Sequence, residues 1–233
     1  MTTWRVTSWN ILGSHEPDLA RIADVLRELD PDVVALQEVR RHQARSLARA
    51  LQWNRVWGRK HHPYSPLVWW RTEGHAILSR WPLSERRRST LTPGTSTWIF
   101  RHRIVLTATV RRDADSLRLF DTHLASDDVD QRIAQARRVA AIVAADSHPQ
   151  KVLAGDLNTT DDNIDDVLRE LRTAGLVDPG GGPTEPAQRP RQRLDHVLVP
   201  GGATTCWTHV PDGDDGWRML SDHLPVTVEI EVG

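Results

Sequence analysis

Apolar residues along the chain follow two patterns, which predict two kinds of element. Short apolar runs and apolar–polar alternation indicate β-strands, whereas apolar residues recurring every three or four positions indicate amphipathic helices. The predicted strands cover residues 4–9, 33–36, 74–79, 97–111, 116–122, 151–154, 194–199, 203–209 and 224–232. The predicted helices cover residues 18–29, 41–51 and 129–145, with a fourth that begins at Asp161 or Asp162 and ends at Leu171. Segments 53–73, 84–96 and 175–193 are predicted loops, the first with strand fragments.

The order of these elements predicts a fold class. Strands alternate with helices and with strand pairs, and neither an internal repeat nor a low-complexity linker interrupts them. The length of 233 residues is enough for one large domain with a full core. We therefore predict a single α/β domain over residues 1–233, with two mostly antiparallel sheets packed inside helices.

Composition adds few constraints, but the distribution of charge is uneven. The net charge is −1, which gives no overall field that would attract a polyanion. Residues 1–112 carry 19 Lys/Arg and 9 Asp/Glu, whereas residues 113–233 carry 11 and 22. If the two halves pack together, one flank is basic and the other offers a cation site.

The chain has the composition of a soluble protein. The only cysteine, Cys206, rules out a disulfide framework and is expected to be a buried small apolar residue. There is no apolar run of about 18 residues that would span a membrane, and no signal-peptide segment. We therefore expect a cytoplasmic protein without a membrane span, and a monomer.

Polar residues follow the predicted buried strands at six places. They are Asn10, Glu38, His123, Asp156 with Asn158, Asp195, and Asp222 with His223. Singly, each is explained as a turn or cap residue that bonds its own backbone. Six such coincidences are improbable, and strand ends place side chains on a rigid rim where a cleft forms.

The residue types in this set suit the hydrolysis of phosphate esters. Carboxylate and amide oxygens are the ligands that Mg²⁺ prefers, and the lack of cysteine argues against a structural zinc site. An imidazole beside a carboxylate binds a phosphoryl oxygen as a cation or acts as a base. A metal and such groups together neutralise phosphate charge and activate water.

Seven motifs, in order along the chain, resemble those of a known superfamily. They are Ser8-Trp9-Asn10, Leu36-Gln37-Glu38, Gly74–Arg80, Asp121–Leu124, Gly155–Asn158, Arg193–Val197 and Ser221–Pro225. This set resembles the endonuclease/exonuclease/phosphatase superfamily of Mg²⁺-dependent phosphoesterases, which includes apurinic endonucleases, pancreatic-type deoxyribonuclease, neutral sphingomyelinases and inositol polyphosphate 5-phosphatases. The resemblance implies a four-layer α/β sandwich, with two packed sheets flanked by helices.

The resemblance also implies a metal site. Glu38 matches the main Mg²⁺ ligand of the superfamily, with Asn10 and Asp222 assisting directly or through water. Mn²⁺ is the expected substitute ion. A single ion at Glu38 fits the pattern, and so does a pair of ions with the second near Asp156 and His223.

The remaining matches imply catalytic roles. Asp156 matches the residue that orients and deprotonates the attacking water, and Asn158 matches a residue that positions the water and a phosphate oxygen. His223 matches the phosphate-binding histidine, with Asp195 as its hydrogen-bond partner. His123 matches a residue that contacts substrate and stabilises pentavalent phosphorus or the leaving group.

Two regions leave the substrate open. Residues 98–103 replace a Glu-Pro-Arg-Gly-like stretch of small bacterial relatives, so Arg101 or Arg103 is the expected substrate-side arginine. In segment 53–71, aromatic residues alternate with basic ones, a pattern that would stack bases and hold phosphates. Burial in the core is the favoured explanation for most of the ten tryptophans.

The sequence therefore predicts a metal-dependent phosphoric ester hydrolase. A phosphatase or phosphodiesterase acting on a small phosphorylated metabolite, a nucleotide or a lipid head group fits the short chain and the net charge near zero. An endonuclease or exonuclease acting on DNA or RNA is the alternative. A non-catalytic binding module of the same fold is the third interpretation, disfavoured because every expected site position is filled.

Overall fold

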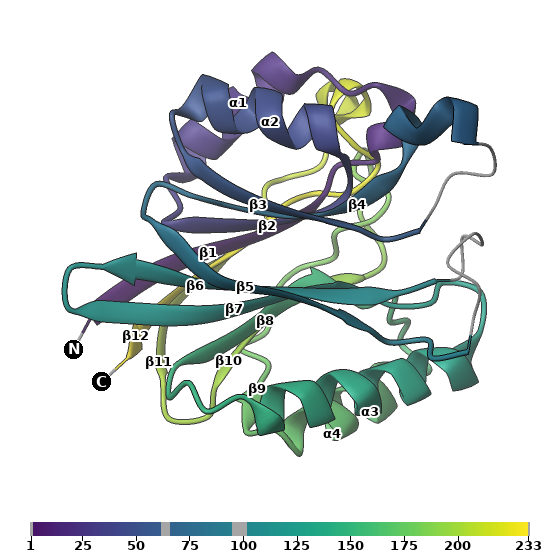
Figure 1. Cartoon of the computed structure of the whole chain (residues 1–233). Helices are drawn as coiled ribbons and strands as arrows, with labels where there is room; N and C mark the ends of the chain where they lie inside the picture. Colours follow the sequence, from purple (N-terminus) through teal and green to yellow (C-terminus); the bar gives the residue numbers. More distant parts are fainter. Residues whose placement is uncertain (1, 62–65, 95–101, 233) are drawn as a thin grey trace.

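A computed structural model describes residues 2–61, 66–94 and 102–232 of the chain. Two six-stranded sheets pack face to face, and two helices cover the outer face of each sheet (Figure 1). The predicted four-layer α/β sandwich is confirmed. The N- and C-terminal strands are neighbours in one sheet, so both ends of the chain lie at the same side of the molecule.

The first sheet has the strand order β11-β12-β1-β2-β4-β3. Its strands are β1 (Thr2–Asn10), β2 (Val33–Arg40), β3 (Asn54–Arg59), β4 (Glu73–Ser79), β11 (Thr204–His209) and β12 (Val226–Val232). Among the described strand pairs of this sheet, only β1 and β2 run parallel, and α1 (Leu19–Leu29) connects them.

The second sheet has the order β5-β6-β7-β8-β10-β9. Its strands are β5 (Leu83–Thr90), β6 (Ile104–Arg112), β7 (Asp115–His123), β8 (Lys151–Asp156), β9 (Leu176–Val177) and β10 (Asp195–Pro200). Its one parallel pair in the described chain is β7 with β8, which α3 (Val129–Ala145) connects.

The helices begin and end largely where the periodicity predicts. The other two are α2 (Arg41–Leu51) and α4 (Ile164–Arg172), and short 3-10 turns occur at η1 (Gly13–His15), η2 (Pro66–Arg71) and η3 (Asp215–Met219). The carboxylate of Asp18 accepts hydrogen bonds from the backbone N–H groups of Ala20 and Arg21, which caps α1. In the described part of the chain, none of these helices combines the length and apolarity that crossing a bilayer demands.

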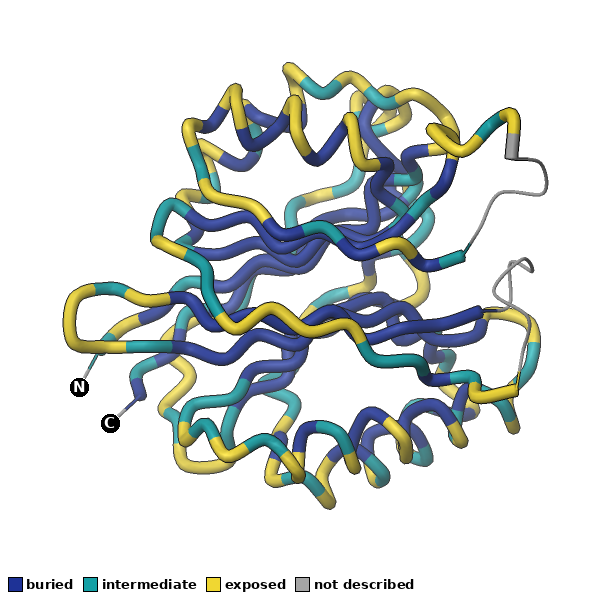
Figure 2. The backbone as a smooth tube through the Cα atoms, viewed as in Figure 1, coloured by how far each residue is buried: buried dark blue, intermediate teal, exposed yellow. Residues whose placement is uncertain are grey.

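Three apolar layers hold the sandwich together (Figure 2). The central layer, between the sheets, takes side chains from both, such as Ile77 and Leu119. One outer layer lies between the first sheet and α1 and α2, and the other between the second sheet and α3 and α4. Strands that are buried on both faces explain the continuous apolar runs in the sequence.

Segment 84–96, predicted as a loop, is largely a strand. Leu83–Thr90 forms β5, which pairs with β6 at the edge of the second sheet. The prediction was wrong because an edge strand is held by backbone hydrogen bonds, so its exposed Arg-rich side chains carry no apolar period. The predicted strand at 97–111 begins at Ile104, and residues 97–101 lie outside the described chain.

One expectation about burial is corrected, and the expectation that most tryptophans pack into the core holds for the majority of those described. Cys206 is exposed on the edge strand β11 and is not a core residue. The tryptophans divide into three groups: Trp4 and Trp9 are fully buried, Trp53, Trp57, Trp81 and Trp217 are partly buried, and Trp69, Trp70 and Trp207 are exposed. Trp98 lies outside the described residues.

Gly155 is required where β8 passes close to β7. A Cβ at this position would lie 2.1 Å from the backbone oxygen of Thr122, which cannot move without shifting its strand. Gly155→Ala is therefore expected to lower the free energy of unfolding by about 1–3 kcal/mol, as overpacking does elsewhere. Urea unfolding measures this, with Gly202→Ala as the control because a Cβ at Gly202 meets nothing within 4 Å. Equal stability of the two variants would contradict the close contact.

Candidate active site

The carboxyl ends of the two parallel strand pairs meet at the end of the sandwich opposite the chain termini (Figure 1). Asn10 ends β1, Glu38 lies near the end of β2, His123 ends β7 and Asp156 ends β8. These four side chains line a cleft of about 290 Å³ between the sheets. Parallel strands connected by helices bring their carboxyl ends to one edge, which explains why residues far apart in sequence converge here.

Most predicted site residues line this same cleft. Besides the four strand-end residues, they are Arg103, Asn158, Asp222 and His223. Asp195 lies behind His223, where it contacts the imidazole and does not line the cleft. Arg101 lies outside the described residues.

The backbone is strained at two of these positions. Glu38 has φ of 54° and Asn158 has φ of 50°, in the left-handed region that non-glycine residues avoid. The register of β2 against β4 shifts between Leu36 and Val39, so a bulge turns the Glu38 side chain toward the cleft. Strain of this kind, on the order of 1–3 kcal/mol per residue, gathers at functional sites.

Asp156 is buried at the centre of the cleft. Its Oδ2 accepts a hydrogen bond from Asn10 Nδ2 at 3.0 Å, and its Oδ1 accepts one from the backbone N–H of Asn158 at 3.0 Å. Burial raises the pKa of Asp156 to about 7, against the opposing effect of the charge on His223. A carboxylate with a pKa near neutrality is suited to accept a proton.

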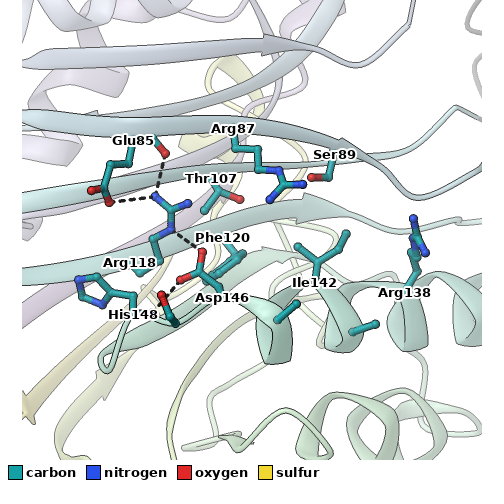
Figure 3. Close-up of a pocket in the computed structure, with 13 residues that line it drawn as sticks. Glu85, Arg87, Ser89, Thr107, Arg118, Phe120, Arg138, Ile142, Asp146 and His148 are labelled. Carbon is teal, nitrogen blue, oxygen red and sulfur yellow. Dashed lines mark hydrogen bonds and ion pairs between the residues drawn. The ribbon is translucent and has the colours of Figure 1, made fainter.

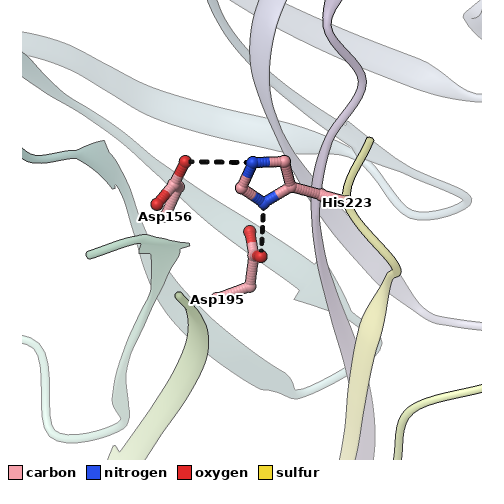
Figure 4. A group of neighbouring side chains, drawn as sticks. All are labelled: Asp156, Asp195 and His223. Carbon is pink, nitrogen blue, oxygen red and sulfur yellow. Dashed lines mark hydrogen bonds and ion pairs between the residues drawn. The ribbon is translucent and has the colours of Figure 1, made fainter. Parts of the chain in front are cut away.

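His223 lies between two carboxylates from the second sheet (Figure 4). Its Nδ1 is 2.7 Å from Asp195 Oδ2, and its Nε2 is 3.9 Å from Asp156 Oδ2. A carboxylate only accepts, so Nδ1 carries a proton that it donates to Asp195. Burial alone would lower the pKa of His223, but the charges of Asp195 and Asp156 raise it well above its usual value. The imidazole is therefore cationic at neutral pH.

His123 is held in the opposite state. Burial and the positive charge of Arg103 lower the pKa of His123 well below its usual value, so the ring is neutral. Its Nδ1 lies 3.5 Å from Glu38 Oε1 and its Nε2 3.6 Å from Asp156 Oδ2. Nδ1 is buried and has no hydrogen-bond partner within the described chain. A polar atom of this kind is available to a bound ligand.

The cleft contains two charged residues that sequence reasoning did not assign. Lys60 and Glu73 both line it. Burial and the charge of Arg103 lower the pKa of Lys60 to about 8, and burial and the charge of Glu38 raise that of Glu73 to about 7. Composition offered one signal, because lysine occurs at only two positions in a chain that otherwise uses arginine.

Two buried cations share this cleft with carboxylates and do not pair with them. Lys60 and Arg103 are 4% and 5% exposed, yet neither forms an ion pair with any residue the structure describes. Arg103 Nε is buried without a hydrogen-bond partner in the same set. A buried charge is costly unless paired, so the spacing leaves room for an anion against the cations and a cation against the carboxylates.

One close group of donors among the described residues could hold a divalent cation, and further oxygen donors line the same cleft. Asp156, Asp195 and His223 offer ligand atoms within 4.8 Å of one another, but the proton between His223 and Asp195 competes with a metal there. Glu38 offers a carboxylate, with Asn10 and the half-exposed Asp222 lining the same cleft. Oxygen donors of this type suit a hard cation such as Mg²⁺.

A second cavity, of about 650 Å³, lies between β5–β7 and α3 (Figure 3). The Arg118 guanidinium dominates it, donating to Asp146 Oδ2 at 3.0 Å and to the backbone oxygen of Glu85 at 2.8 Å. None of the predicted site residues lines this cavity. Its one buried guanidinium is already paired with Asp146, so the larger volume does not mark the site of reaction.

A cleft of carboxylates, histidines and buried cations at the strand ends of a four-layer α/β sandwich has the groups that hydrolysis of a phosphate ester requires. The chain matches the Endonuclease/Exonuclease/phosphatase family over residues 7–223 and belongs to that family. Members of this family are hydrolases that act on phosphate esters. A search of curated proteins finds no match.

Solved structures agree with the fold. An endonuclease/exonuclease/phosphatase from Beutenbergia cavernae is 26% identical, with a TM-score of 0.81, covering 100% of this chain and 72% of that one. A mannosyl-6-phosphatase from Bacteroides thetaiotaomicron is 17% identical, with a TM-score of 0.75 and 98% and 100% covered. TDP2 from D. rerio, solved with a single-strand DNA product, is 21% identical, with a TM-score of 0.76 and 100% of both chains covered.

Proposed function

We propose that the protein is a Mg²⁺-dependent hydrolase of phosphate esters, with Mn²⁺ as a substitute ion. One observation carries this proposal: Lys60 and Arg103 are buried in the same cleft as Glu38 and Asp156 without forming ion pairs. A phosphate bound next to a divalent cation satisfies both sets of charges at once. The ligands we propose for the cation are Glu38, Asn10 and Asp222.

The cation, when bound, supplies charge neutralisation at a phosphoryl oxygen and acidifies water. The chain contributes the rest of the electrostatic environment. The protonated His223 donates from Nε2 to a phosphoryl oxygen, and Asn158 positions both the water and a phosphate oxygen. Arg103 and Lys60 neutralise the oxygens that face the opposite wall. Fixed charges of this kind in a desolvated cleft are the main source of stabilisation for phosphoryl transfer.

Asp156 is the proposed general base. Its pKa of about 7 lets it accept a proton from water near neutral pH, and its two hydrogen bonds fix the carboxylate orientation. Water then attacks phosphorus in line with the bond to the leaving group. Neutral His123 donates a hydrogen bond to the developing charge, and Lys60, with a pKa of about 8, can return a proton to the leaving oxygen.

Chelation tests the proposal directly. Hydrolysis of p-nitrophenyl phosphate or bis-p-nitrophenyl phosphate is expected to stop in excess EDTA and to return with Mg²⁺ or Mn²⁺. Glu38→Gln keeps the side-chain volume but removes the ligand charge, so its activity should require at least about tenfold more Mg²⁺, on the scale of weakened metal coordination. Full activity in EDTA would refute the metal mechanism. A Mg²⁺ titration of Glu38→Gln that matches the wild type would refute Glu38 as a ligand.

A further inference from the structure

Between Glu38 and Glu73 the chain contains no acidic residue. Residues 39–72 carry one lysine and seven arginines, at Arg40, Arg41, Arg45, Arg49, Arg55, Arg59 and Arg71. Arg40 pairs with Glu16. The other six are exposed, and none of them forms an ion pair with any described residue. This half of the first sheet therefore has a basic outer face that the protein itself does not neutralise.

The arginines are arranged so that they repel one another. Arg41, Arg45 and Arg49 recur every four residues on the exposed face of α2. Partial burial, and after it the charges of these three arginines, lower the pKa of Arg55 on β3. Like charges at this spacing destabilise the unbound protein. A polyanion that binds across them removes the repulsion, so the pattern fits a phosphate backbone.

Tryptophan side chains line a groove beside these arginines. The groove has a volume of about 340 Å³ and is lined by Arg41, Trp57, Arg59, Trp69, Trp70 and Arg88. The rings of Trp69 and Trp70 are 62% and 51% exposed and meet edge to face, with centroids 6.4 Å apart. No acidic side chain is among the described residues that line it. Aromatic faces between cations bind unpaired bases with little regard to sequence.

This tryptophan–arginine groove adjoins the active-site cleft. Arg59 lines the groove and the next residue, Lys60, lines the cleft. Likewise, Thr72 lines the groove and the next residue, Glu73, lines the cleft. Successive strand residues point to opposite faces, so the ends of β3 and β4 form a wall between the two sites. A flexible strand could pass over this wall with one phosphate in the cleft.

We propose that the tryptophan–arginine groove binds single-stranded nucleic acid and thereby makes a nucleic acid strand the substrate presented to the cleft. The presentation of a phosphate for hydrolysis rests on the proposed function, whereas binding in the groove does not. A groove lined by both aromatic rings and cations fits a base with its phosphate better than a lipid surface, which would contact a convex apolar protrusion. Double-stranded DNA is disfavoured because its stacked bases do not expose their faces to tryptophan.

Binding is tested without catalysis, by fluorescence anisotropy of a labelled oligothymidylate of about 15 nucleotides in EDTA. We expect saturable binding by the wild type that Trp69→Ala/Trp70→Ala weakens at least about tenfold, on the scale of lost base stacking. Arg41→Gln/Arg45→Gln should weaken binding and reduce the slope of log Kd against log salt by about 1.4, for two lost phosphate contacts. The salt range is about 50–200 mM NaCl.

Matched controls remove the same side chains elsewhere. Trp207 is exposed on β11 and Arg138 is exposed on α3, so Trp207→Ala and Arg138→Gln should bind and hydrolyse as the wild type does. Equal losses in these controls would overturn the proposal, as would wild-type affinity in both groove variants or no binding at all. Partition onto phosphatidylglycerol vesicles in place of oligothymidylate binding would also overturn it. Absence of hydrolysis with intact, groove-dependent binding would refute only the proposed function.

Discussion

Replacing Asp156 with asparagine is expected to lower kcat by at least about 10²-fold and by as much as about 10⁴-fold, the range for losing a general base. The amide has the same shape as the carboxylate, but its single oxygen keeps only one of the two hydrogen bonds that Asp156 accepts from Asn10 and Asn158. The larger part of the loss in kcat reflects proton transfer and charge. Steady-state hydrolysis of bis-p-nitrophenyl phosphate with saturating Mg²⁺ measures it. Asp113→Asn, which removes an exposed carboxylate from the β6–β7 turn, serves as the control and should keep wild-type turnover.

The same substitution should change how stability depends on pH. Because burial raises the pKa of Asp156 to about 7, the folded protein holds a proton that the unfolded chain has already released. Stability that depends on this proton therefore falls as the pH rises from about 4 to about 7, and a neutral amide removes that loss. In EDTA, the Tm of the variant relative to that of the wild type should rise as the pH is raised from about 5 to about 8. A Tm difference that does not change with pH would contradict the raised pKa of Asp156, and near-normal turnover would exclude it as the base.

The second large effect is expected at His223. His223→Ala should lower kcat by at least about 10²-fold, because a positioned charge at the phosphoryl oxygen is lost. Asp195→Asn should act through the imidazole. The charge of Asp195 raises the pKa of His223, so its removal should move the alkaline limb of the kcat/KM profile to lower pH.

The pH profile separates this role from a structural one. Asp161 is exposed and its replacement by asparagine removes the same unit of charge outside the cleft, so its profile should match the wild type. An unshifted limb in Asp195→Asn would contradict the assigned partnership, whatever the change in kcat. Turnover within a few-fold of the wild type in His223→Ala would exclude His223 from phosphate binding.

Much of the architecture follows from apolar periodicity. The helix predicted at 129–145 coincides with α3, and that at 41–51 coincides with α2, because each has an apolar face spaced every three or four residues. Buried strands were found from their continuous or alternating apolar residues. The edge strand β5 was missed because its backbone, and not its side chains, holds it in the sheet.

The cleft could be predicted only in part. Residues that end buried strands, such as Asn10, His123 and Asp156, are marked by the polar residue that follows an apolar run. No such pattern identifies Lys60 and Glu73 in the sequence. They lie in the cleft because β3 pairs with β4, which brings the two residues to the same end of the sheet. The exposed Trp69 and Trp70 went against the general expectation that aromatic rings lie in the core. Their exposure depends on tertiary structure, which a sequence pattern does not contain.

The strand orders of the two sheets have a consequence for how the site is divided. From edge to edge, each sheet repeats the same series of pairings: two antiparallel, one parallel, two antiparallel. The halves are thus topological copies in which β1 and β2 correspond to β7 and β8. Glu38 and Asp156 are then counterparts, and the proposed roles of cation ligand and general base are divided between the two copies. Residues from both sheets line the cleft, so neither half of the sandwich could form this site alone.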